Sequence, residues 1–421
     1  MNARSLILKG LAYAAGDGSV TVANAIVFTV VLRYLSPSDF GYLSIGQAIN
    51  SSVQPILYMG ASLVAVRLIA AHTEATASIT KRMVALRFAA AAIVSLGTVS
   101  AALVSSDRSL SAVLFAYAFL FFFYPIQPDF VAVGLHRPRI YSTARMLGSA
   151  CFVVGLFALT RLHLRSWMVP LVYSTSLAVS AIYAYRSLWP ALRGAREPMS
   201  LPTSVLFRGA IAVVAAQFLQ MGQYFTDVIV LSFWKVVPIA TIGEYSAVSR
   251  LVQTGALPFV ALIYSLAPMY VREFEKGDME EVKKLERRFR ICLALVGVLG
   301  ASVLITLGPW ALEKVSGRAM PSAHRLVYIF AIAYFLVALH NSYTGILFYA
   351  GATHLYVATY GLGLLTTLVF TALLVPQFGF FGSAWAMVAG MAAILVSSFF
   401  FHRGILRTRV ASQLVAPVEV G

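Results

Sequence analysis

The sequence predicts an all-α integral membrane protein, with twelve transmembrane helices in two six-helix lobes around a central cavity. Apolar residues make up 60% of the 421 residues and charged residues only 11%, whereas soluble domains carry about 45–50% and about 25%. Apolar runs of about 20 residues, the length that crosses a bilayer, recur along the whole chain. Helices are expected because a single strand cannot satisfy its backbone hydrogen bonds in lipid.

The apolar runs divide the chain into twelve expected spans. The first run follows Arg4 and Lys9 and continues to Leu32, which is too long for the apolar region of a cleavable signal peptide. The expected spans are 11–32, 41–66, 84–105, 110–133, 142–160, 167–189, 209–233, 244–270, 291–310, 326–350, 355–375 and 381–401.

The charge of the chain is strongly positive, at +16. Such a charge can indicate nucleic acid, but in membrane proteins Lys and Arg collect in cytoplasmic loops and contact anionic lipids. When the loops are assigned alternately to two sides, most of the 32 basic residues fall on the side of the N-terminus. We therefore expect a multi-pass protein of the plasma (inner) membrane with both termini in the cytoplasm, surrounded by membrane lipids and without a nucleic-acid partner.

A short repeat indicates that the two halves are related. Phe40–Ser44 (FGYLS) follows the first span, and Ile242–Ser246 (IGEYS) follows the seventh, with Pro55 and Pro258 later in the next spans. Six spans per half would give both halves the same orientation in the membrane. The expected organisation is an N-terminal lobe (1–189), a cytoplasmic linker (190–208), a C-terminal lobe (209–410) and a cytoplasmic tail (411–421).

Polar residues form helical stripes in four spans that occupy equivalent positions in the two halves. Polar groups inside a bilayer are costly and normally face a cavity or one another. The stripes are Asp17, Thr21 and Asn24 in the first span, Gln47, Asn50, Gln54 and Tyr58 in the second, Gln217, Gln220, Tyr224 and Asp227 in the seventh, and Arg250, Gln253 and Thr254 in the eighth. Their symmetric placement favours a hydrated cavity, whereas for each stripe alone hydrogen bonding between helices explains the pattern equally well.

Arg250, Asp17 and the pair His340 and Asn341 have two interpretations each. Arg250 cannot lose its proton and needs an anionic partner or water, so it either binds a substrate phosphate or pairs with Asp227. Asp17, between two glycines, is either a proton or sodium site or an interfacial acid. His340 and Asn341 in the tenth span either line the cavity or form a buried structural pair.

The long basic segment Arg272–Arg290 predicts a helix at the inner membrane surface. Asp278 and Glu281 have the spacing of a capping box, and Glu286 and Arg290 are spaced as an ion pair. The helix either contacts an anionic headgroup or a substrate phosphate, or is simply solvated.

Neither a metal site nor an enzyme active site is indicated. Cys151 and Cys292 are far apart in apolar segments, with no metal-ligand spacing. Neither a phosphate-binding glycine loop nor a Ser-His-Asp constellation can be placed, so we expect no enzymatic activity, no metal and no cofactor.

Four segments resemble the polysaccharide transporters, the Wzx-type flippases of the multidrug/oligosaccharidyl-lipid/polysaccharide exporter superfamily. They are Leu35–Tyr42 (LSPSDFGY), Gly134–Tyr141 (GLHRPRIY) with Arg145, Gly243–Ser246 with Arg250, and Tyr349–Gly351 through Val375–Ala384 (VPQFGFFGSA). The resemblance implies a cationic cavity, alternating access, and an oligosaccharide on a polyprenyl pyrophosphate as cargo. It implies that Arg250 matches an arginine that holds the pyrophosphate in related flippases.

The sequence therefore predicts a flippase that moves such a lipid-linked oligosaccharide from the inner to the outer leaflet for synthesis of a surface polysaccharide, such as exopolysaccharide or O-antigen. Polysaccharide polymerase machinery and a coupling proton or sodium ion are the further partners considered. A cation-coupled multidrug antiporter that uses Asp17 is the alternative. A membrane glycosyltransferase or polymerase fits less well, because such enzymes use a large outer loop with catalytic acids and the expected outer loops are short.

Overall fold

The computed structural model describes residues 3–58, 62–194, 203–234, 237–255, 259, 279–349 and 352–415. Every regular element in these ranges is a helix, so the predicted all-α fold class is confirmed. The chain divides into two compact units, Met1–Phe218 and Leu219–Gly421. We call them the N-terminal and C-terminal lobes and describe each by itself; the lobe boundaries expected from the sequence remain predictions.

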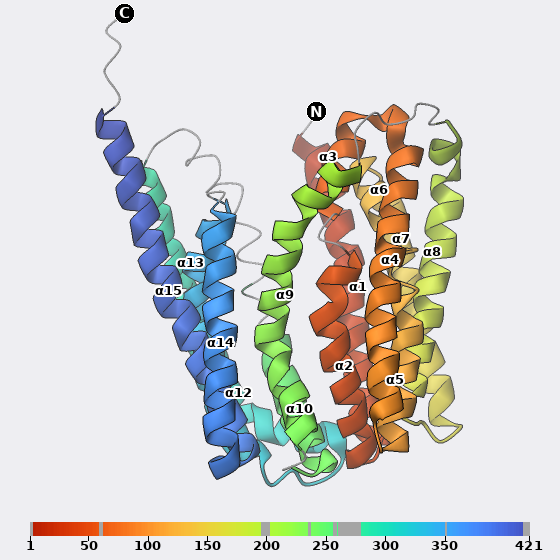
Figure 1. Cartoon of the computed structure of the whole chain (residues 1–421), viewed down its shortest axis with the longest axis vertical. Coiled ribbons are helices and arrows are strands. Elements are labelled where there is room, and N and C mark those ends of the chain that lie inside the picture. Colours follow the sequence, from red (N-terminus) through yellow and green to blue (C-terminus); the bar gives the residue numbers. More distant parts are fainter. Residues whose placement is uncertain are drawn as a thin grey trace, which may run out of the picture. The chain divides into compact units, whose positions relative to one another are not determined.

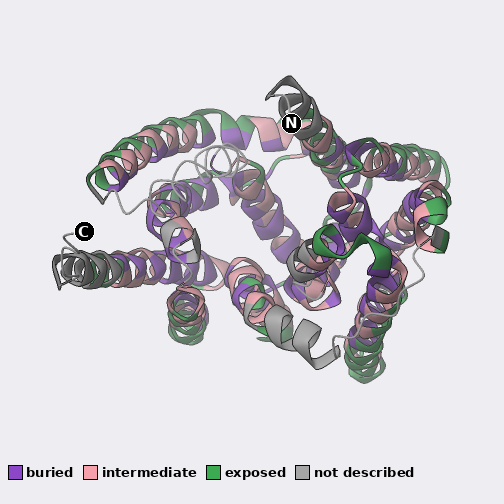
Figure 2. Cartoon of the chain, turned by 90° about the horizontal axis from the view of Figure 1, so that it is seen from above, coloured by how far each residue is buried: buried purple, intermediate pink, exposed green. Residues whose placement is uncertain are grey.

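The helices have the length and composition of membrane spans. Within the described ranges, eight helices are long and apolar enough to cross a bilayer, and Arg108–Phe121 is a shorter apolar helix. Large apolar side chains are exposed along these helices, among them Ile93 and Leu96 in one lobe and Leu295 and Leu299 in the other. Figure 2 shows this pattern as green outer faces on helices whose inner faces are purple. Exposed apolar faces of this extent suit lipid, not water.

The N-terminal lobe is a helical bundle (Figure 1). Its helices are α1 (Ala3–Tyr34), α2 (Pro37–Tyr58), α3 (Ser62–Ala71), α4 (Thr76–Val104), α5 (Arg108–Phe121), α6 (Asp129–Gly134), α7 (Pro138–Thr160) and α8 (Met168–Gly194), with a 3₁₀ turn at Thr73–Ala75. Helix α1 packs on α7, α7 on α8, and α4 on α5. Helix α9 (Thr203–Trp234) begins in this lobe and ends in the next.

The predicted span 110–133 is not one helix. It is divided into α5, which ends at Phe121, and the short α6, which begins at Asp129. Pro125 and Pro128 lie between them, and proline inside a helix removes a backbone donor and clashes with the preceding turn. The break matters for function, because it turns the carbonyl of Gln127 and the carboxylate of Asp129 toward their neighbours.

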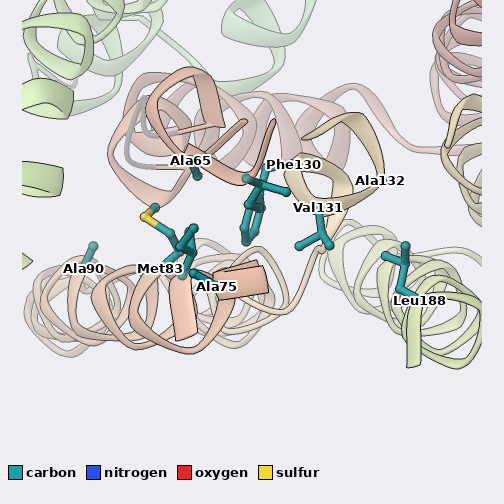
Figure 3. Close-up of a cluster of buried hydrophobic side chains, with 10 residues drawn as sticks. Ala65, Ala75, Met83, Ala90, Phe130, Val131, Ala132 and Leu188 are labelled. Atoms are coloured by element: carbon teal, nitrogen blue, oxygen red, sulfur yellow. The ribbon is translucent and has the colours of Figure 1, made fainter. Parts of the chain in front are cut away.

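An apolar cluster fixes α6 in place. Phe130 and Val131 of α6 are buried against Met83 of α4, Ala65 of α3 and Leu188 of α8 (Figure 3). Close packing between helices is a main source of their association in a membrane. Asp129, the residue before Phe130, is therefore carried on an anchored segment.

The C-terminal lobe contains the end of α9, α10 (Ile239–Gly255), α12 (Met279–Ser316), α13 (Ala323–Tyr349), α14 (Thr353–Phe378) and α15 (Phe380–Val415). Helices α14 and α15 form a tight hairpin. Its only connecting residue is Gly379, whose φ of 58° is readily adopted by glycine. Gly379, within the segment Val375–Ala384 that resembles the polysaccharide transporters, thus makes the sharp turn into the last helix.

Candidate functional site

Three charged side chains meet inside the N-terminal lobe. The carboxylate of Asp129 lies between two guanidinium groups: its Oδ1 is 3.9 Å from Nη1 of Arg87, and its Oδ2 is 3.7 Å from Nη2 of Arg145. Arg87 comes from α4, Asp129 from α6 and Arg145 from α7. Two positive groups thus share one carboxylate within this cluster.

Arg87 is a structural member of the cluster. Its side chain is fully buried, and its Nη1 donates a hydrogen bond of 3.0 Å to the carbonyl of Gln127 in the α5–α6 break. The guanidinium also lies 4.6 Å from the ring centre of Phe130 and 5.6 Å from that of Tyr58. A cation held by a carbonyl, a carboxylate and two aromatic faces is well compensated.

Arg145 is held much less tightly. About a third of its side chain is exposed, and its guanidinium lies 5.2 Å from the ring centre of Tyr141. Among the described residues its ion pair is the contact with Asp129, which at 3.7 Å is too long for a hydrogen bond. A guanidinium carries five N–H donors, so those of Arg145 are available to water or to an anion.

Arg145 opens onto a cavity. The cavity has a volume of about 50 Å³ and is bounded by α1, α2, the α5–α6 connection, α6, α7 and α8. Its polar wall includes Asn24, Tyr58, Gln127, Asp129, Tyr141, Arg145, Ser149, Tyr173, Ser176 and Ser180. A single water needs about 10–15 Å³ by this measure, so the cavity holds a few waters or one small anionic group.

The α1 stripe reaches this cavity at one position. Asn24 lines it. Asp17 does not line it, but accepts a hydrogen bond of 2.6 Å from the hydroxyl of Tyr141, which does. Thr21 bonds back to the carbonyl of Asp17 in its own helix. Asp17 is exposed and is linked to the cavity through Tyr141.

The α2 stripe divides between the cavity and helix packing. Tyr58 lines the cavity. Asn50 is buried and accepts a hydrogen bond of 2.9 Å from the hydroxyl of Tyr124. Gln47 and Gln54 are half-buried.

The α9 stripe forms a ladder of uncharged contacts in the C-terminal lobe. Gln220 donates to the hydroxyl of Tyr360 and accepts from that of Tyr356, each at 3.3 Å. One turn further on, Gln223 donates to Thr367 at 2.8 Å. Gln217 is exposed and Tyr224 is half-buried.

Asp227, at the end of this ladder, is fully buried. It accepts hydrogen bonds from the hydroxyl of Tyr245 on α10 and from the amide of Val228 at 2.7 Å. Tyr245 is thus a partner of this carboxyl that the sequence did not suggest, and the pairing of Asp227 with Arg250 remains a prediction.

The remaining predicted residues of the C-terminal lobe are less enclosed or differently placed. Arg250 and Gln253 on α10 are half-buried, and Gln253 donates to Ser249 at 3.3 Å. His340 on α13 is fully buried with its ring against that of Tyr360. Asn341 bonds back to the carbonyl of Val337 in its own helix.

Of the three charged residues that form the N-terminal site, the sequence pointed only to Arg145, as part of a segment that resembles the polysaccharide transporters; Arg87 and Asp129 were not singled out. Arg87 and Arg145 lie near the ends of the expected spans 84–105 and 142–160, where they contribute to the basic side of the charge bias, and the structure brings both to Asp129. One available signal was the spacing of Tyr141, Arg145 and Ser149, four residues apart, which places them on one helix face.

Neither a family model nor a curated protein matches this sequence. Solved structures match it closely in fold. A multidrug resistance MATE family transporter of the MOP superfamily, in its inward-facing conformation, has a TM-score of 0.80 at 10% identity, covering 94% of this chain and 96% of that one.

Two further structures have the same fold. A MOP superfamily transporter from Pyrococcus furiosus, described as having a binding pocket of reverse polarity, has a TM-score of 0.66 at 10% identity, covering 95% of this chain and 94% of that one. A mutant of the Vibrio cholerae MATE transporter VcmN has a TM-score of 0.64 at 13% identity, covering 96% of this chain and 97% of that one. This chain therefore has the twelve-helix, two-lobe fold of the MATE transporters of the MOP superfamily.

Proposed function

We propose that this protein is a transporter, and that its cargo is an anionic lipid-linked saccharide, an oligosaccharide on a polyprenyl pyrophosphate, moved from the inner to the outer leaflet of the plasma membrane. The fold similarity supports transport as the general activity. The cargo class rests on the site in the N-terminal lobe and on the motifs in the sequence.

The observation that carries the proposal is the open guanidinium of Arg145. Near the cavity wall, Asp129 faces both Arg87 and Arg145, so its contact with Arg145 is a long one of 3.7 Å and leaves the guanidinium partly exposed to the cavity. Arginine binds phosphate oxygens through two parallel N–H donors. A phosphate that enters the cavity would be stabilised by Arg145, whereas a cation would be repelled by it.

The size of the cavity limits which part of the cargo it holds. With about 50 Å³, it accommodates a few oxygen atoms of a phosphate group and not a saccharide. In the proposed mechanism Arg145 recognises the charged linkage, while the polyprenyl chain remains in lipid. Different saccharides on the same linkage would then be accepted.

Reconstitution tests this proposal directly. The purified protein is placed in liposomes that contain a fluorescent polyprenyl-pyrophosphate-linked sugar, and the fraction exposed to an impermeant quencher is followed with time. A charge-assisted hydrogen bond contributes about 1.5–3 kcal/mol, so Arg145→Gln should slow transfer by roughly 10- to 100-fold. Arg145→Lys, which keeps the charge but loses the planar fork, should lie between this variant and the wild type.

Arg139→Gln is the matched control. Arg139 is an exposed arginine near the start of the same helix, and its replacement removes the same charge without touching the cavity. The control should transfer the lipid at the wild-type rate. Wild-type transfer by Arg145→Gln would remove the cavity from the proposed function.

The alternative function is cation-coupled export of drugs. Two carboxylates favour it: Asp227 is fully buried with a tyrosine and an amide as its hydrogen-bond partners, and Asp17 is exposed beside Tyr141. Buried acids in membrane helices often bind protons or cations. Efflux of a cationic dye from proteoliposomes, lost in Asp227→Asn or Asp17→Asn and accompanied by no transfer of the saccharide lipid, would favour this function.

A further inference from the structure

The first turns of α12 are a second, separate feature of the molecule. Helix α12 has 38 residues and is therefore about 57 Å long at about 1.5 Å per residue, well beyond the roughly 30 Å of a hydrocarbon core. Its early turns are polar, while the later part carries exposed apolar side chains such as Leu295 and Leu299. The polar turns must therefore reach the membrane surface.

One face of these turns is anchored inside the lobe. Val282 and Glu286 are buried, and Oε1 of Glu286 lies 2.9 Å from Nε2 of His402 on α15. Oε2 of Glu286 is 4.0 Å from Nη2 of Arg290, whose guanidinium lies 4.9 Å from the ring centre of Tyr343 on α13. Contacts from two neighbouring helices thus fix the rotation of α12 about its axis.

The opposite face is basic and exposed. It consists of Lys283, Lys284, Arg287 and Arg288, which we call the α12 basic face. Lys284 is 3.4 Å from Glu281, whereas Lys283, Arg287 and Arg288 contact no acidic group among the described residues. Three positive charges in two adjacent turns are therefore available to an outside anion.

The basic face is continuous with the lipid-facing side of the same helix. Lys284 and Arg288 are followed at +3, +7 and +11 from Arg288 by Ile291, Leu295 and Leu299, which are all exposed. This spacing keeps all five on one helix face. An acyl chain lying along the apolar residues would place its headgroup at Arg287 and Arg288.

We propose that the α12 basic face binds the phosphate of an anionic phospholipid, in the leaflet that meets the beginning of α12. By the bias of Lys and Arg along the sequence, this is the cytoplasmic leaflet. The apolar continuation selects a lipid over a soluble anion, and the positive charges select an anionic headgroup over a zwitterionic one. The site is independent of the saccharide cargo.

The test compares lipid binding by the whole protein in nanodiscs. Dioleoylphosphatidylglycerol is titrated into discs of dioleoylphosphatidylcholine, and the lipid that remains bound after extraction is quantified by mass spectrometry. Each basic residue contributes about five-fold to such binding, so Arg287→Gln with Arg288→Gln should weaken it by roughly 30-fold. Arg287→Lys with Arg288→Lys, which keeps the charge, should retain most of it.

The matched control is Lys314→Gln with Arg325→Gln. These exposed residues lie at the other end of α12 and at the start of α13, and their replacement changes the net charge equally. The control should bind phosphatidylglycerol like the wild type. An equal loss in the control, or unchanged binding in the Arg287/Arg288 variant, would overturn the site.

Two added measurements separate lipid from a soluble phosphate. Raising the salt concentration should weaken binding through screening, while added inorganic pyrophosphate should displace little lipid. Efficient displacement of the lipid by pyrophosphate would overturn the lipid assignment in favour of a soluble anion. Because neither measurement uses the saccharide lipid, failure here leaves the transport proposal standing, and failure of transport leaves this site standing.

Discussion

In the N-terminal lobe the central polar groups are charged, whereas in the C-terminal lobe they are mostly hydroxyls and amides. Arg87, Asp129 and Arg145 form an ionic cluster beside a cavity. In the other lobe, Gln220 bonds to tyrosines and Gln223 to a threonine. Both lobes nevertheless tie their repeat motif by a tyrosine to an aspartate, through Tyr42 and Asp107 in one and Tyr245 and Asp227 in the other.

The difference indicates that the two lobes have different tasks. Arg145 and Asp129 are partly exposed and 3.7 Å apart, so an anion that enters the cavity can compete with Asp129 for Arg145. A ladder of neutral hydrogen bonds mainly fixes helix positions and helix rotations. We therefore infer that the N-terminal lobe supplies recognition of the charged linkage and that the ladder keeps the C-terminal lobe rigid.

The largest expected effect on stability is that of Arg87→Met. Breaking a buried ion pair costs about 3–5 kcal/mol, and this change also leaves the carbonyl of Gln127 without its donor. We expect a lowered midpoint of thermal unfolding in detergent. Adding Asp129→Leu should recover part of the loss, because the double variant no longer carries a carboxylate that has lost its contact with Arg87.

Arg325→Met serves as the reference for Arg87→Met. Arg325 is exposed at the start of α13, and surface substitutions usually change stability by less than about 0.5 kcal/mol. An Arg87→Met protein as stable as this reference would show that the ionic cluster does not hold the N-terminal lobe together.

The next largest loss of stability is expected when the hydrogen bond between Tyr245 and Asp227 is removed. Tyr245→Phe removes the hydroxyl that donates to the buried Asp227, and an unsatisfied buried acceptor costs about 1–3 kcal/mol, or more if it is charged. Asp227→Asn keeps an acceptor for Tyr245 and should cost less. Thermal unfolding of both variants tests this order, and the reverse order would show that the carboxylate is compensated by groups other than Tyr245.

A smaller effect is expected from filling the close approach at Gly390. A methyl group there would meet Thr367 and Gln223, the pair that forms one rung of the ladder. Overpacking costs about 1–3 kcal/mol. Gly18→Ala, with open space around the new methyl group, is the control and should be at least as stable as the wild type, because alanine favours a helix over glycine by about 1 kcal/mol. A Gly390→Ala protein as stable as this control would mean that the new methyl group is accommodated without cost.

The smallest effect concerns Asp107 in the α4–α5 turn, outside the spans. Partial burial raises its pKa, but hydrogen bonds from Tyr42 and from the amides of Leu110 and Ser109 outweigh burial, so the pKa lies below the ordinary value. Its stabilisation is therefore complete above the ordinary pKa of about 4 and is lost as the pH falls through the lowered value.

Asp107→Asn measures this contribution. Asparagine still caps α5 but cannot take a charge, so the variant should be less stable than the wild type by up to about 1 kcal/mol near pH 7. The difference in unfolding temperature should shrink below about pH 4. A difference that is constant from pH 7 to pH 3 would mean that the charge of Asp107 contributes nothing.

Some residues of the site could be predicted from sequence patterns, and others could not. The stripe spacing identified Asn24 and Tyr58, which line the cavity, and Gln220, which belongs to the ladder. The contacts of Arg145 were not accessible, because an arginine a few residues inside a helix has the same hydropathy pattern whether it faces the headgroups or a cavity. Asp278, proposed as a helix cap, lies outside the described residues.

What the sequence by itself determined is the class of fold, through apolar runs long enough to cross a bilayer and the helical phase of the polar residues; that the short repeat marks two related halves remains a prediction. These features are local, because hydropathy and the 3.6-residue period are properties of one segment. Only the tertiary structure decided which polar residues meet, as Arg87 and Arg145 do at Asp129, and Tyr245 at Asp227. Such meetings depend on the rotation and depth of each helix against its neighbours, and packing between segments sets both.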